Sequence, residues 1–118
     1  MTALPLDVES LKAASDGSAL YVGMAVFPDC SDPVPCTAER LEQEEARKTS
    51  GRIYDRLFVR HWDSWEDGRR NHVFRIPLGD DGLPGGPAAD LMAGVDGDCP
   101  TKPFGGTEDY AISPDGSW

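Results

Sequence analysis

The chain has 118 residues, 39% of them hydrophobic, which is typical of one folded domain rather than of a disordered segment. Its formal net charge of -10, from 21 acidic and 11 basic side chains, would repel a phosphate backbone, so we expect no nucleic-acid partner. The longest apolar run covers residues 19–27 and is far shorter than the roughly 20 residues of a membrane-spanning helix, so we expect no membrane partner either.

The first element expected along the chain is a strand over Ala19–Phe27. This segment is apolar without alternation, and an Asp16-Gly17 pair before it and Pro28 after it supply turns. A helix is the competing interpretation, but Gly23 and the Val and Tyr content disfavour it. The pattern therefore predicts a strand that is buried on both faces.

A helix is expected over residues 37–49. Thr37 is a suitable N-cap, Arg47 and Lys48 suit the last turn, and Gly51 is a suitable stop. Few of its positions are apolar, so most of its surface should be solvated. It is typical of an insertion on a β scaffold.

A hairpin is expected next, with strands over Arg52–Trp62 and Asn71–Leu78 and a turn at Asp67-Gly68. In the second strand one set of side chains shares a face and should point inward. That set is His72, Phe74, Ile76 and Leu78.

Turns are frequent after residue 78, where many of the 13 glycines and 10 prolines fall. Residues 79–87 should form a turn, 88–92 a brief edge strand and 93–107 a loop. A further strand should begin at Tyr110–Ser113 and lead into a turn just before Trp118. Because the chain stops where the next strand should start, we expect it to be part of a larger fold.

The cysteines are Cys30, Cys36 and Cys99, and their spacing matches no strong metal-binding motif. Cys30 and Cys36 could form a disulfide or remain as two free thiols, and the sequence leaves both states open. An oxidising compartment would favour the disulfide. No signal peptide is predicted, because no basic residue precedes Lys12. If Met1 is not the true start, the compartment stays open, with a periplasmic or secreted location favoured over the cytoplasm.

Two Asp-Gly turns recur in matching surroundings. Ser15-Asp-Gly-Ser18 precedes the first apolar strand, and Ser113-Pro-Asp-Gly-Ser117 precedes Trp118. The spacing corresponds to about one propeller blade when the helical insertion is allowed for, which indicates an internal repeat. The Ser-Pro-Asp-Gly motif resembles the turn between the first two strands of a blade in peptidase and periplasmic β-propellers.

Other segments resemble the propeller of the dipeptidyl-aminopeptidase/acylaminoacyl-peptidase branch of the prolyl oligopeptidase family. The stretch Arg60-His-Trp-Asp63 is the most specific part, and the resemblance spans nearly the whole chain. The supporting segments are Tyr54–Asp63, Trp65, Asp67-Gly68, His72–Phe74, Lys102–Gly106 and Glu108–Tyr110.

The resemblance implies a mainly β fold over residues 1–118: an incomplete propeller of about one blade plus the start of the next, with one helix inserted near 37–49. It implies a parent serine exopeptidase in which this N-terminal propeller restricts entry to short peptide substrates. The missing blades and a C-terminal α/β-hydrolase domain with a Ser-Asp-His triad would be its partners outside this chain. No G-x-S-x-G occurs here. We therefore assign no catalytic, cofactor-binding or metal residue, predict no cofactor, and expect the chain alone to be inactive.

Two other interpretations remain. In the first, the chain is part of a non-enzymatic periplasmic propeller that serves as a binding or scaffold protein. In the second, the chain is a self-contained small α+β domain. A single blade needs neighbours to cover its two faces, so we expect the isolated chain to be marginally stable.

Several polar clusters invite a functional interpretation, but a structural one is favoured for each. Residues 60–63 could line the propeller tunnel or a domain interface, although a structural network is favoured. The run Glu42–Glu45 suits a solvated helix face, and the acidic pairs at 80–81 and 96–98 suit turns because a calcium loop needs a closing Glu. His61 and His72 lack a clear third metal ligand.

Overall fold

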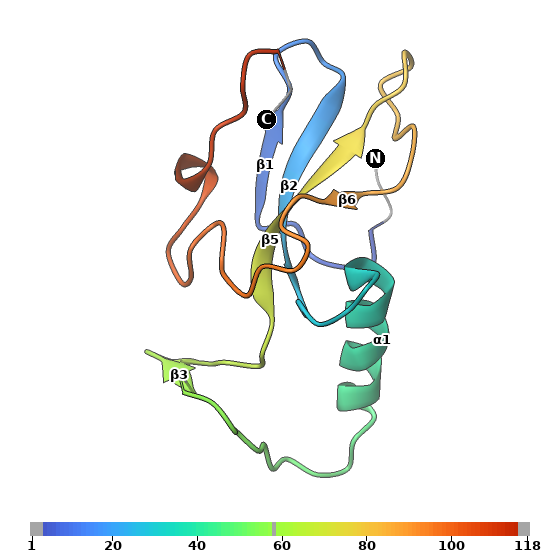
Figure 1. Cartoon of the computed structure of the whole chain (residues 1–118). Coiled ribbons are helices and arrows are strands. Elements are labelled where there is room, and N and C mark those ends of the chain that lie inside the picture. The colour runs from blue at the N-terminus through green and yellow to red at the C-terminus, as the bar shows by residue number, and fades with distance from the viewer. Residues whose placement is uncertain (1–3, 58, 116–118) are drawn as a thin grey trace.

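The computed structural model describes residues 4–57 and 59–115, and its centre is a four-stranded antiparallel sheet in the order β1-β2-β5-β6 (Figure 1). The strands of this sheet are β1 (Ser10–Ala13), β2 (Ala19–Val26), β5 (Arg70–Pro77) and β6 (Ala89–Asp90). The other elements are α1 (Pro33–Glu45), the two-stranded hairpin of β3 (Arg60–His61) and β4 (Ser64–Trp65), and the 3-10 helix η1 (Thr107–Asp109). No helix of the described ranges is long and apolar enough to cross a membrane. The fold is thus mainly β with one helix, as expected, but these elements do not by themselves show a propeller.

The long strands β2 and β5 pair along their whole length. Ala19 lies opposite Pro77 at one end of the ladder and Val26 lies opposite Arg70 at the other. The predicted strand at 19–27 is therefore confirmed, and so is the one at 71–78. The predicted pairing of 71–78 with 52–62 is wrong, because β5 pairs with β2 instead. The physical reason is that β2, apolar on both faces, needs a partner that can also be buried, and residues 52–62 carry three arginines.

One face of the sheet is covered by α1 and the segment before β1. The residues of this core are Leu6, Val22, Met24, Val26, Phe74 and Ile76, with Val34, Ala38 and Leu41 of α1 packed on them. Figure 1 shows α1 beside one end of the sheet. The predicted inward face of β5 is confirmed for His72, Phe74 and Ile76, which are each 2% exposed or less, whereas Leu78 is only half-buried.

The opposite face is covered by the C-terminal third of the chain. Here Ala14, Ala19, Tyr21 and Val73 form a second core, with Met92, Cys99, Tyr110 and Ile112 packed against it. Pro100 approaches the sheet so closely that a Cβ added at Gly23 would lie 3.0 Å from its Cδ. The expectation that both faces await neighbours outside the chain is therefore wrong for β2 and β5.

The helix begins and ends earlier than predicted. Asp32 is the N-cap and Pro33 opens the first turn, where its missing N–H costs no hydrogen bond. Thr37, the predicted N-cap, lies buried inside α1, and its Oγ1 accepts a hydrogen bond from the Phe27 N–H at 3.0 Å. The helix stops at Glu45, so the predicted extension to residue 49 and the stop at Gly51 are wrong.

The C-terminal segment lies along β1, a strand that the sequence did not reveal. Tyr110–Ser113 is not a strand as predicted, because side chains rather than a backbone ladder hold it: Lys12 Nζ donates to the Tyr110 carbonyl. Ser15 Oγ donates to the Pro114 carbonyl at 2.6 Å, which places the first Asp-Gly turn motif beside the described start of the second one. Residues 116–118, the end of the second turn motif, lie outside the described residues. The brief edge strand at 88–92 is confirmed as β6, and the loop after it is also confirmed.

A buried polar cluster fastens β5 to the segments that follow it. His72 Nδ1 lies 2.8 Å from the Asp90 carboxylate, and its Nε2 lies 3.1 Å from the Val95 carbonyl. The other Asp90 oxygen accepts the Met92 N–H at 2.8 Å. Both side chains are nearly inaccessible to water, so each depends on the other for its hydrogen bonds.

We expect His72→Ala to lower the free energy of unfolding by about 3 kcal/mol, because it leaves a cavity and a buried carboxylate without its partner. Urea unfolding of the purified chain measures this difference. Leu91→Ala, at a half-exposed neighbour of Asp90, is the control and should change it by less than about 1 kcal/mol. A His72 variant as stable as the control would contradict the role given to the cluster.

Candidate functional site

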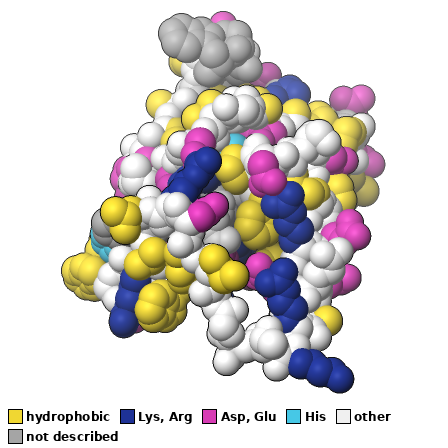
Figure 2. All heavy atoms as spheres, turned by 60° about the horizontal axis from the view of Figure 1, so that its bottom comes forward, with side chains coloured by type: hydrophobic (Ala, Val, Ile, Leu, Met, Phe, Trp, Pro, Cys, Tyr) yellow, Lys and Arg dark blue, Asp and Glu magenta, His cyan; other side chains and the backbone are white. Residues whose placement is uncertain are grey.

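An open groove with a volume of 1230 Å³ lies between α1, the linker 49–57 and the turn before β5. The loop around Val95 forms its remaining wall, and Phe27 and Pro28 contribute apolar surface. In Figure 1 the linker runs away from the body of the molecule before it returns to β3. Figure 2 shows this end of the molecule from below, with basic and acidic side chains around a hollow.

The groove is rich in charge of both signs. It is lined by five of the 11 basic residues of the chain, namely Arg40, Arg47, Arg52, Arg56 and Arg70. It is also lined by six acidic residues, namely Asp29, Glu44, Asp55, Glu66, Asp67 and Asp96. In a chain of net charge -10 this is a local concentration of cations. The groove therefore gathers charges of both signs at one place.

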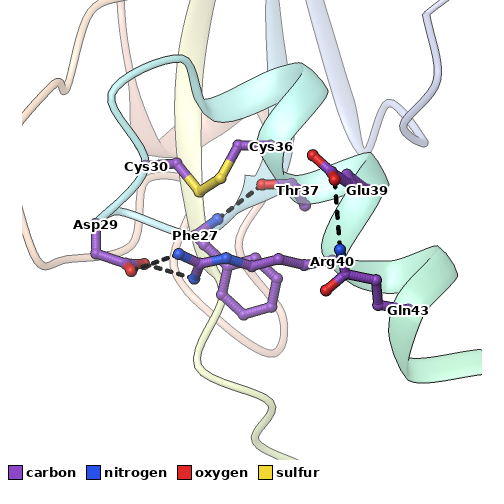
Figure 3. Close-up of a disulfide and its surroundings, with 8 residues drawn as sticks. All are labelled: Phe27, Asp29, Cys30, Cys36, Thr37, Glu39, Arg40 and Gln43. Atoms are coloured by element: carbon purple, nitrogen blue, oxygen red, sulfur yellow. Dashed lines mark hydrogen bonds and ion pairs between the residues drawn. A yellow bond between two sulfur atoms is a disulfide. The ribbon is translucent and has the colours of Figure 1, made fainter. Parts of the chain in front are cut away.

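A clamp at the start of α1 fixes one wall of the groove (Figure 3). Arg40 donates two hydrogen bonds to the Asp29 carboxylate, at 2.9 and 2.7 Å, and its guanidinium lies 4.9 Å from the centre of the Phe27 ring. The hydrogen bonds from Arg40 lower the pKa of Asp29 below its ordinary value and raise that of Arg40. Directly after Asp29, a disulfide joins Cys30 to Cys36 in the first turn of α1. Of the two states left open by the sequence, the structure thus has the disulfide.

Asp96 joins the opposite wall to the linker. It accepts a hydrogen bond from Arg70 Nε at 2.8 Å and forms an ion pair with Arg56 at 3.5 Å. The backbone of Asn71 donates to Asp98 at 2.8 Å. The acidic pair at 96–98, which was expected to form only a turn, therefore also carries ion pairs, and no local pattern predicts these long-range partners.

The stretch 60–63, the most specific part of the resemblance, lies in the β3–β4 hairpin beside the groove. The Arg60 guanidinium lies 5.1 Å from the centre of the Trp65 ring. Trp62 adopts a positive φ of 55° and makes an edge-to-face contact with Phe104 at 5.1 Å. His61 lines a smaller hollow with Lys102. The structure thus places these side chains on an aromatic surface rather than in the groove.

The other polar side chains that the sequence analysis considered lie in the helix, in a turn and in the core. Glu42–Glu45 is exposed, as predicted, and Glu44 alone of that run lines the groove. Asp81 accepts the Leu83 N–H at 3.0 Å within its own turn, which confirms the turn expected there. His72 is held by Asp90, and within residues 4–57 and 59–115 no group of three His, Cys, Asp or Glu side chains could hold a metal ion.

The described residues offer no activated nucleophile. A His and an Asp do pair, at His72 and Asp90, but both are buried and the second ring nitrogen faces the Val95 carbonyl, so no hydroxyl could be activated there. Burial, aided by the Asp109 carboxylate, raises the pKa of the Cys99 thiol. A reactive cysteine needs the opposite shift. Among the described residues, the groove therefore presents a charged surface, and the buried His72–Asp90 pair lies apart from it.

We expect the double variant Cys30→Ser, Cys36→Ser to lower the free energy of unfolding by about 2 kcal/mol, because the unfolded chain regains the freedom of a short loop. The measurement is urea unfolding in the absence of reductant. With a reducing agent present, the original chain should fall to the stability of the variant. Equal stability of the two chains without reductant would mean that the disulfide adds nothing.

We expect Asp29→Asn to lower the free energy of unfolding at pH 7 by about 0.5 kcal/mol, since the pair with Arg40 is partly exposed. Because Arg40 lowers the folded pKa of Asp29, the stabilisation is present above the ordinary value of 3.8 and is lost as pH falls through the folded value. Unfolding curves at several pH values measure the difference. Asp7→Asn, at an exposed position, is the matched control, and a difference that persists at pH 2 would argue against the clamp.

The chain is similar to fungal proteins named dipeptidyl-peptidase 5. It is 38% identical over 122 residues to that of Aspergillus fumigatus, an alignment that covers 98% of this chain and 16% of the relative. It is 38% identical over 91 residues to the probable dipeptidyl-peptidase 5 of Aspergillus niger, with 70% of this chain and 12% of the relative covered. For the Aspergillus oryzae protein the identity is 40% over 78 residues, with 59% and 11% covered.

The chain thus spans less than a fifth of the length of these relatives. No family model matches it. No solved structure matches it.

Proposed function

We propose that this chain is part of a serine exopeptidase that acts on short peptides, of the dipeptidyl-aminopeptidase/acylaminoacyl-peptidase branch of the prolyl oligopeptidase family. The observation that carries the proposal is the 38% identity to a protein named dipeptidyl-peptidase 5 over 98% of the chain. Two sequence features support the finer assignment to this branch. The stretch Arg60-His-Trp-Asp63 resembles the propeller of the branch, and the Ser-Pro-Asp-Gly motif resembles the turn of a propeller blade.

In this proposal the chain contributes to an N-terminal β-propeller that restricts access to the catalytic centre. The missing blades and an α/β-hydrolase domain with a Ser-Asp-His triad lie outside the chain. The mainly antiparallel β structure is compatible with a blade, and the absence of an activated nucleophile among the described residues agrees with chemistry located elsewhere. In this proposal the wall of the groove at α1 and just after it, which carries Arg40, Glu44 and Arg47, supplies a charged surface for one end of a short peptide.

A secreted or periplasmic location is part of the proposal. Disulfides persist in oxidising compartments and are rare in the cytosol, where thiols are kept reduced. The bond between Cys30 and Cys36 therefore supports an extracytoplasmic parent protein.

We expect the full-length parent, expressed from the gene that contains this sequence, to release dipeptides from chromogenic peptide substrates. Ser→Ala at its G-x-S-x-G motif should lower kcat by at least about 10³-fold, since the nucleophile is lost. The chain of 118 residues, assayed at the same molar concentration, should release no product. The measurement is product release per minute.

A full-length protein without G-x-S-x-G and without hydrolysis would contradict the peptidase proposal. It would favour a non-enzymatic propeller that binds ligands or serves as a scaffold. Hydrolysis by the 118-residue chain itself would show that the chemistry had been assigned to the wrong part of the protein.

A further inference from the structure

The most exposed large apolar side chains lie mainly on one segment, which leaves the body of the chain after α1 and returns at β5. We call residues 49–65, which comprise the linker and the β3–β4 hairpin, the arm. Ile53 is 98% exposed and Leu57 is 94% exposed. Trp62 is 75% exposed, and its contact partner Phe104 is 70% exposed. Single exposed apolar residues are common on protein surfaces, but several of them together mark a surface that another protein covers.

The described part of the arm, residues 49–57 and 59–65, is joined to the rest of the chain by contacts at the surface, such as that of Trp62 with Phe104. An exposed ion pair joins Arg56 to Asp96 at 3.5 Å, and the Tyr54 ring stacks on Trp65 with centroids 6.2 Å apart. Exposed ion pairs of this kind contribute little stability. Figure 2 shows hydrophobic side chains gathered beside a basic one at the edge of this end of the molecule. The apolar surface of the arm is therefore not explained by packing inside the chain.

The two faces of the central sheet provide the contrast. Helix α1 covers one face of β2 and β5 together with Leu4, Leu6 and Ala88, and residues of the segment 92–112 cover the other face. A neighbouring structure could therefore reach neither face of these two strands directly. Among the described residues, the most exposed large apolar side chains left for an external partner lie on the arm and at Phe104.

We propose that the arm, together with Phe104, is the docking surface for the rest of the parent polypeptide, through a patch that consists of Ile53, Leu57, Trp62, Trp65 and Phe104. The length of the aligned relative argues that the rest of the polypeptide covers the arm. The alignment covers 98% of this chain but only 16% of the relative. Most of the protein that could cover the arm is thus linked to it covalently, at a high effective concentration.

The charges on the arm specify the chemistry of the docking face. Arg52, Arg56 and Arg60 alternate with the apolar residues of the arm. The docking face should have an apolar centre that receives Ile53 and Leu57, with carboxylates around it to pair with these arginines. The inference rests on the longer parent in the proposed function, but it does not depend on peptidase activity.

The three arginines also provide the test, because trypsin cleaves after each of them. We expect cleavage after Arg52, Arg56 and Arg60 to be at least about tenfold slower in the full-length parent than in the 118-residue chain, since docking would protect the arm. Mass spectrometry of the products over time gives the rate at each site. Equal rates in the two proteins would overturn the proposal.

The double variant Ile53→Asp, Leu57→Asp in the full-length parent should restore most of the lost cleavage, because two carboxylates cannot be buried in an apolar contact. Leu83→Asp is the matched control: Leu83 is a half-exposed leucine on the turn after β5, away from the arm, and its variant should remain protected. Circular dichroism shows whether each variant keeps its fold. Protection that survives in a folded double variant would overturn the proposal.

The two proposals fail separately. A protected arm in a full-length protein that releases no dipeptide supports docking and contradicts the proposed function. Rapid cleavage of the arm in a full-length protein that does release dipeptides contradicts docking and supports the proposed function. If the 118-residue chain alone elutes as a dimer with its arm protected, a second copy is the occupant and the docking proposal is wrong.

Discussion

The antiparallel pairing of β2 with β5 is the constraint on which the rest of the structure depends. The two strands match residue by residue from Ala19 opposite Pro77 to Val26 opposite Arg70, and nearly all of their side chains are buried or half-buried on both faces. A pair of this kind is stable only when both of its faces are removed from water. The helix and the long C-terminal segment are therefore both required by the same two strands.

The two covers are fastened in different ways. On one side the Phe27 N–H bonds to Thr37 and the Cys30–Cys36 disulfide closes the turn, so α1 is tied directly to the end of β2. On the other side, the described part of the C-terminal segment forms no strand after β6, and separate hydrogen bonds hold it. The Cys99 N–H donates to the Asn71 carbonyl, and the Asn71 side chain donates to the Pro100 carbonyl. The groove lies where the first cover ends and the linker begins, which is why its walls carry charge rather than core residues.

The sequence predicted the elements whose signal is local and strong. The uniform apolar run of β2, the alternation in β5 and the glycines and prolines at 79–87 each identify a conformation without long-range information. Partner choice is not local, and this explains the wrong hairpin: residues 52–62 have strand-forming side chains, but their arginines would be buried if they paired with β5. Likewise the helix start depends on Pro33 and on the disulfide loop, which outweigh the N-cap preference of Thr37.

The candidate site was less accessible to prediction than the fold. Arg40 and Asp29 are separated by a turn and a helix start, and Asp96 meets Arg70 across 26 positions. No motif encodes such pairs, since ion pairs at a groove depend on where the strands place distant loops.

A larger propeller would contact this unit differently from an ordinary blade. In an ordinary blade each sheet face is covered by the adjoining blade, whereas here β2 and β5 are already covered by the chain's own helix and loop. Neighbours would then meet this unit through those covers and through the exposed arm. The stretch Arg60-His-Trp-Asp63, which carries the most specific resemblance, lies on that arm and outside the sheet. Its distinctive sequence would then reflect the demands of a contact between parts of the parent protein, because a surface that must fit a partner tolerates fewer side chains than one that faces water.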